Sequence, residues 1–163
     1  MKHYTSIEQS KRLLELGLPP ESADMSYSNF CPKGLSYSDP YNIFAIPYTE
    51  AKEVLDRHIQ RYGGDQYDGI IAWNVIPCWS VGALLGLMPA NIKAKESTEP
   101  YSLMVFKDKV EYNGDDYYRV EYGYGNPMTV GWLNEWYETK GGFDLMESVF
   151  LMVVWLLENG YIK

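Results

Sequence analysis

Apolar residues recur at helical spacing in three parts of the chain, and the first of these lies near its beginning. The spacing predicts a helix over residues 6–16. Thr5 and Glu8 fit a capping box, in which the Thr5 oxygen binds the Glu8 amide and the Glu8 side chain reaches back. Gly17 is a natural end, and the two prolines that follow it prevent continuation. The partly apolar face contains Ile7, Leu13, Leu14 and Leu16.

Two further helices follow from the same periodicity. Thr49 is expected to cap the second helix, which continues to Tyr62 and ends before two glycines. Asp144 and Glu147 form another capping-box pattern, and Gly160 ends the helix that follows it. Residues 149–157 of that helix are apolar on nearly every face, and a helix of this kind is usually buried. We therefore expect this C-terminal helix to form the centre of the core.

Alternation of apolar and polar residues predicts strands over residues 42–47 and 101–106. Asn113 and Gly114 tolerate the positive φ angles of a two-residue hairpin turn, so a strand is expected on each side of them. Beyond this turn two sets of residues should face opposite ways. One set is Tyr118, Val120, Tyr122 and Tyr124, and the other is Tyr117, Arg119 and Glu121.

These elements predict a single α+β domain over residues 1–163. Its sheet should be an antiparallel β-meander of about three to five strands, packed against helices that include the buried C-terminal one. Residues 25–41 show no clear period and contain many Ser, Tyr, Asn, Pro and Gly residues, which indicates a long surface loop.

Cys78 lies where an apolar, strand-like run gives way to a short apolar helix ending near Met88. A thiol in the first turn of that helix would have a lowered pKa and could act as a nucleophile. His58 would have to be its base, although thiol hydrolases usually place their histidine after the cysteine. The alternative is a packed corner residue, with Ser80 capping the helix.

An aromatic group, Trp132, Leu133, Trp136 and Tyr137, follows the meander at the spacing of one face of a short helix. Such a face either belongs to the core or, when exposed, provides the anchors of a binding surface. We expect an aromatic and acidic binding surface. Its members are Tyr122, Tyr124, Trp132, Trp136, Tyr137, Glu111 and Glu121.

The formal net charge of −8, with no basic run, disfavours direct binding of nucleic acid. It permits a different hypothesis, in which the protein mimics nucleic acid and occupies a basic partner. No spacing of Cys and His suits a metal and no phosphate loop is present, so we expect no metal and no cofactor. The chain contains no apolar signal region or membrane-length apolar stretch, which favours a cytoplasmic protein without membrane contact.

The chain contains the blocks LLELGL at 13–18, PCWSVGALL at 77–85 and VWLLENG at 154–160. In these blocks it resembles a family of short, uncharacterised proteins encoded by prophages and other mobile elements of gut anaerobes. The resemblance extends over almost the whole chain and implies an accessory role, without a known activity. We therefore expect a non-enzymatic accessory or protein-binding module, with a thiol hydrolase and an acidic nucleic-acid mimic as the alternatives.

Overall fold

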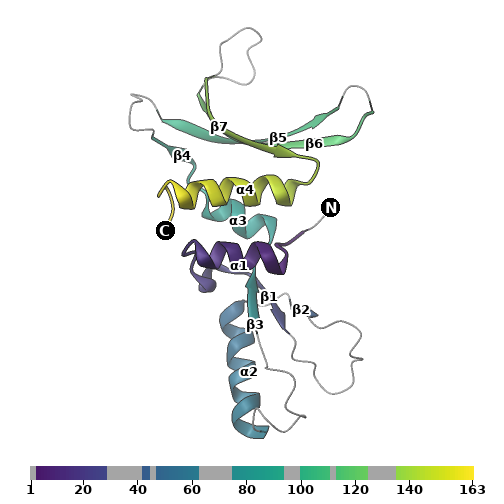
Figure 1. Ribbon diagram of the computed structural model, residues 1–163, viewed down its shortest axis with the longest axis vertical. Coiled ribbons are helices and arrows are strands. Elements are labelled where there is room, and N and C mark those ends of the chain that lie inside the picture. The colour runs from purple at the N-terminus through teal and green to yellow at the C-terminus, as the bar shows by residue number, and fades with distance from the viewer. Residues whose placement is uncertain are drawn as a thin grey trace. The chain divides into compact units, whose positions relative to one another are not determined.

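The chain forms two compact units in a computed structural model (Figure 1). The N-terminal unit covers Tyr4–Ala83, and the C-terminal unit covers Leu84–Lys163 together with Met1–His3. Our expectation of one domain stays a prediction. The structure describes residues 3–28, 42–44, 47–62, 75–93, 100–110, 113–124 and 135–163.

The N-terminal unit contains a three-stranded antiparallel sheet of order β2-β1-β3, against which helices pack. The helices α1 and α2 both contact β3. The elements are α1 (Ile7–Glu15), a 3₁₀ turn (Pro20–Ser22), β1 (Met25–Ser28), β2 (Asn42–Phe44), α2 (Tyr48–Tyr62) and β3 (Val75–Cys78). The helix α3 (Val81–Leu87) follows β3 and continues into the C-terminal unit.

The capping box of α1 lies one residue later than predicted. Ser6 is the N-cap and exchanges hydrogen bonds with Gln9, so the pairing of Thr5 with Glu8 was wrong. Thr5 is instead fully buried, where its hydroxyl contacts Ser10 at 2.8 Å and accepts a hydrogen bond from the Trp79 amide at 3.0 Å. A long-range contact has therefore displaced a local one.

The predicted ends of the other helices agree better with the structure, except at the start of α2. Gly17 ends α1 with a φ of +92°, as predicted. Thr49 does not cap α2, because that helix already begins at Tyr48. Asp144 is the N-cap of the C-terminal helix, where its side chain accepts a hydrogen bond from the Met146 amide.

The C-terminal unit is the predicted meander with its helix. The antiparallel sheet has the order β4-β5-β6-β7, and α4 packs against β6 and β7 on one face (Figure 1). The elements are β4 (Asn91–Ile92), β5 (Tyr101–Lys109), β6 (Asp116–Tyr124), β7 (Glu135–Gly142) and α4 (Leu145–Glu158). The α+β class, the meander and the buried C-terminal helix are thus confirmed.

The hairpin between β5 and β6 is present, but its loop is longer than two residues. The last strand pair is Lys109 with Asp116, and the Val110 amide donates to the Asp115 carbonyl oxygen at 2.9 Å. Gly114 has a φ of +73°, so this glycine does supply the left-handed conformation that the turn requires.

The two predicted faces of β6 are present, with one exception in their burial. Tyr118, Val120 and Tyr122 are all buried, as expected for the face that α4 covers. Glu121 lies on the opposite face, yet it too is only 1% exposed. Alternation alone predicted a solvent-facing carboxylate at this position.

Candidate functional site

The corner at Cys78 is a packed structural element of the N-terminal unit. Cys78 is the last residue of β3 rather than part of the first turn of α3, and its side chain is fully buried. Burial, with a smaller contribution from the charge of Asp24, raises the pKa of the thiol from 9.0 to about 12. The thiol is therefore protonated at neutral pH, which is the opposite of what a nucleophile needs.

The two residues that follow Cys78 in sequence also make contacts that stabilise the fold. The Trp79 ring is fully buried, and its indole nitrogen donates to the Ser22 hydroxyl at 3.0 Å. Ser80 caps α3 as predicted, because its hydroxyl oxygen accepts from the Ala83 amide at 3.1 Å. The same hydroxyl donates to Asp24 at 2.5 Å. Burial and these hydrogen bonds thus account for the conformation of the Cys-Trp-Ser segment.

The proposed pairing of Cys78 with a base stays a prediction. His58 lies in α2, but its side chain is outside the described residues. The described part of the chain contains no group of three His, Cys, Asp or Glu side chains that could hold a metal ion.

Four aromatic rings of the C-terminal unit form a second and more exposed feature, which we call the C-terminal aromatic cluster. Its members are Tyr101, Tyr137, Trp155 and Tyr161. Tyr137 stands at the centre, stacked on Tyr101 at 5.0 Å and edge-on to Trp155 at 5.7 Å between ring centroids. Trp155 stacks in turn on Tyr161 at 5.3 Å. These separations are those of favourable aromatic pairs.

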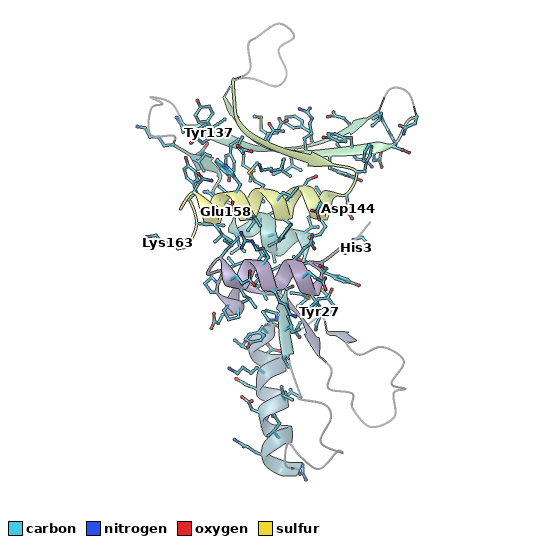
Figure 2. All side chains as sticks on the ribbon, viewed as in Figure 1. His3, Tyr27, Tyr137, Asp144, Glu158 and Lys163 are labelled. Atoms are coloured by element: carbon cyan, nitrogen blue, oxygen red, sulfur yellow. The ribbon has the colours of Figure 1, made fainter. Side chains whose placement is uncertain are left out.

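A β-bulge places Tyr137 in this cluster. Tyr122 and Gly123 are consecutive in β6, but they pair with Glu138 and Trp136, so Tyr137 is an extra residue of β7. Figure 2 shows Tyr137 above the end of α4 that carries Glu158, away from the Asp144 end. The expected helix around Trp136 and Tyr137 was wrong, because both residues lie in a strand.

The end of α4 places the last ring. Gly160 adopts a φ of +72°, and its amide donates to the Leu157 carbonyl oxygen at 3.1 Å. The Tyr161 amide donates to the Leu156 carbonyl oxygen at 2.9 Å, which completes a Schellman motif. This reversal brings the Tyr161 ring back over Trp155, and its hydroxyl lies 3.0 Å from that of Tyr137.

The cluster is only partly covered. Tyr137 is 38% exposed, and the other three members are half-buried. Burial and the hydrogen bond with Tyr137 raise the pKa of Tyr161 to about 12, so this phenol is neutral at physiological pH. The hydroxyl groups of Tyr137 and Tyr161 are thus paired with each other at this surface.

The structure separates the residues that were predicted to form one binding surface. Tyr122 is fully buried and donates a hydrogen bond to the Pro89 carbonyl oxygen at 2.6 Å, which makes it a core residue. Trp132 and Glu111 lie outside the described residues, and so do the side chains of Tyr124 and Trp136. Tyr137 is the predicted member that the structure places at the surface.

Glu121 forms part of an ion-pair network across the meander. One carboxylate oxygen accepts a hydrogen bond from Arg119 at 2.6 Å, whereas the other oxygen is buried without a partner. Arg119 also binds Asp108 at 2.8 Å and lies over the Phe106 ring at 5.0 Å. Burial raises the pKa of Glu121, and this effect outweighs the opposing one of Arg119. The network orders the sheet and does not present the Glu121 carboxylate to a partner.

The sequence analysis missed three members of the cluster. Trp155 was assigned to the core because its helix is apolar all round, and Tyr101 and Tyr161 were not considered for the surface. The glycine before Tyr161 was the available signal, since a helix that ends in a Schellman motif turns its next residue back onto the last turns.

Comparisons with protein-family models, with curated proteins and with solved structures find no match to this chain. Among the helices that the structure describes, none is long and apolar enough to cross a membrane. A function for this chain therefore has to come from the chemistry of the described residues.

Proposed function

We propose that the chain is a non-enzymatic protein-binding module, with an accessory role of the kind that the resemblance to mobile-element proteins implies. The C-terminal aromatic cluster is its contact surface. The observation that carries this proposal is the exposure of Tyr137, a large ring that remains 38% accessible at the centre of four packed aromatic side chains.

The chemistry of the cluster suits protein recognition. Tyr and Trp are enriched among the residues that dominate binding energies, because they bury large apolar areas and lose little conformational freedom. Here the rings already hold one another in place through the contacts of Tyr137 with Tyr101 and Trp155. A partner would thus meet a preorganised surface, which lowers the entropic cost of association.

The position of Tyr137 in β7 bears on how a partner would bind. β7 pairs with β6 on one side and is the last strand of the sheet, so its other edge has no strand partner among the described residues. The bulge at Tyr137 interrupts regular pairing there. We therefore expect side-chain contacts with the cluster, rather than strand addition along β7, to dominate binding.

The two alternatives have less support. The thiol hydrolase requires a thiolate, whereas Cys78 is buried with a raised pKa. A nucleic-acid mimic requires a stripe of unneutralised carboxylates. On the meander Asp116 binds both Lys107 and Lys109, and Asp108 binds Arg119, so described acids there alternate with bases.

Site-specific photo-crosslinking in the producing cell tests the proposal. A benzophenone amino acid at Lys163, an exposed position two residues beyond Tyr161, should crosslink one defined protein. The same group at Phe143 is the matched control, because Phe143 is 62% exposed but directly follows β7, at the end of the strand away from Tyr137. The crosslink from position 163 should disappear in Tyr137→Ala and survive in Tyr137→Phe, which keeps the ring.

A crosslink that persists in Tyr137→Ala, or an equal one from position 143, would overturn the proposal. Circular dichroism must show that Tyr137→Ala is folded. If Trp136 belongs to the same binding surface, Trp136→Ala should also abolish the crosslink without unfolding the protein.

A further inference from the structure

Two asparagines of the chain, Asn113 and Asn159, are each followed by a glycine. Such a pair can react with itself, because glycine has no Cβ to keep its backbone nitrogen away from the side-chain amide of the asparagine. Both asparagines are exposed, and the glycines after them have φ angles of +73° and +72°. The direction of the asparagine side chain is what distinguishes the two pairs.

The side chain of Asn113 points forward along the chain, across Gly114. Its Oδ1 accepts a hydrogen bond from the Asp115 amide at 3.1 Å, and its Nδ2 donates to the Asp115 carboxylate at 2.6 Å. These two contacts span Gly114 and hold the amide carbon of Asn113 on the side of the glycine nitrogen. The bond to Oδ1 also stabilises the negative charge that develops there when a nucleophile attacks this carbon.

The side chain of Asn159 points backward, away from the glycine that follows it. Its Nδ2 donates to the Trp155 carbonyl oxygen at 2.9 Å, and its backbone amide donates to the same oxygen at 3.0 Å. The Gly160 amide is held by the Leu157 carbonyl oxygen in the Schellman motif. Reaction at this pair would require release of the helix end that stacks Tyr161 on Trp155.

The nitrogen of Gly114 also makes a hydrogen bond, which must open before it can react. This amide donates to the Val110 carbonyl oxygen at 2.7 Å. Asn113, Gly114 and Asp115 are all exposed, so this opening separates no buried side chains at these positions. Loops open within nanoseconds to microseconds, which is fast compared with cleavage of an amide. The bond therefore slows the reaction without preventing it.

We propose that Asn113 is a site of spontaneous deamidation and that the folded structure protects Asn159. The nitrogen of Gly114 attacks the amide carbon of Asn113, and the new bond closes a succinimide ring. The bond from this carbon to Nδ2 breaks, and ammonia leaves with the proton that the Gly114 nitrogen loses. Water then opens the ring at either carbonyl carbon, which gives aspartate or isoaspartate.

The modification would change the end of the hairpin between β5 and β6. Either product places a new carboxylate beside those of Asp115 and Asp116. Isoaspartate also inserts the side-chain carbon into the main chain, inside the loop that the bond between the Val110 amide and the Asp115 carbonyl oxygen closes. The Val110 amide should therefore exchange its hydrogen faster in the modified protein.

Peptide mapping by mass spectrometry tests the inference with the full chain. The protein is incubated at mildly alkaline pH, folded in buffer or unfolded in urea, and the acid formed at each asparagine is followed with time. In urea both pairs should react at similar rates, since both are Asn-Gly. In the folded protein Asn113 should react at least about tenfold faster than Asn159, because opening a packed helix end costs more free energy than opening a loop.

A variant and the identity of the products complete the test. Asn113→Gln, shown to be folded by circular dichroism, should abolish the reaction at position 113 and leave Asn159 unchanged, because glutamine closes the corresponding ring much more slowly. Isoaspartate should accompany aspartate at position 113, which is the mark of the succinimide. Equal rates at the two asparagines of the folded protein, or aspartate without isoaspartate, would overturn the inference. So would a position 113 that reacts in urea and not in the folded protein.

Discussion

Substitution of Gly160 by alanine tests how the end of α4 builds the aromatic cluster. Gly160 has a φ of +72°, and a Cβ added there would meet no atom within 4 Å. The whole effect of the new methyl group is therefore on the backbone. The left-handed conformation costs an ordinary residue about 1–2 kcal/mol. Alanine also restricts the unfolded chain, which returns part of this amount.

The net expectation for Gly160→Ala is a loss of about 1 kcal/mol in the free energy of unfolding. For a chain of this size that corresponds to a fall in melting temperature of about 2–4 °C. Gly160→Asn should lie between the two proteins, because asparagine tolerates the left-handed region better than alanine. Stacking of Tyr161 on Trp155 should also weaken, since the Schellman motif positions that ring.

Gly86 provides a control with the opposite expected sign. It lies within α3, its φ is not positive, and a Cβ there would also meet no atom within 4 Å. Gly86→Ala should therefore raise stability by about 0.5–1 kcal/mol. Thermal and urea unfolding followed by circular dichroism measure both variants. A Gly160→Ala protein at least as stable as Gly86→Ala would refute the assigned left-handed conformation and the reasoning built on it.

Three further predictions concern buried polar groups. Tyr122→Phe should lose about 1 kcal/mol of stability in urea unfolding, because it removes the hydrogen bond to Pro89; an unchanged midpoint would contradict that bond. Folding raises the pKa of Glu121 above 4.5, so just above that pH the folded protein binds more protons than the unfolded chain. The free energy of unfolding should therefore fall as the pH rises from 4.5 through the folded-state pKa of Glu121. Glu121→Gln should flatten the decline, and an equal slope in both proteins would show that another group causes it. Cys78, with a pKa of about 12, should react with iodoacetamide at pH 8 only after unfolding, as mapped by mass spectrometry, whereas rapid native labelling would restore the hydrolase hypothesis.

Local patterns were sufficient for the elements whose causes are local. Gly17 and Gly160 end their helices because glycine adopts positive φ without strain, and Asp144 caps α4 because its carboxylate can reach the first free amides. Alternation in β6 correctly separated the face of Val120 and Tyr122 from the opposite one. The α+β class follows from these short-range rules combined with the apolar composition of α4.

Contacts between distant residues decided the remaining features. Ser6 rather than Thr5 caps α1, because the Thr5 hydroxyl accepts a hydrogen bond from the amide of Trp79, which is distant in sequence. Glu121 is buried because strand pairing and Arg119 enclose it, although alternation places it outward. The thiol of Cys78 is protonated because packing removes it from water, an effect that its neighbours in sequence do not reveal.

The candidate site shows the same division between sequence and tertiary structure. The amino-acid sequence determined that Tyr161 follows a helix-ending glycine, which directs its ring back toward α4. Only the pairing of β6 with β7 decided that Tyr137 is the extra residue of a bulge and meets Trp155. Strand register depends on which whole face becomes buried, so it is a property of the assembled sheet and helix rather than of any short segment.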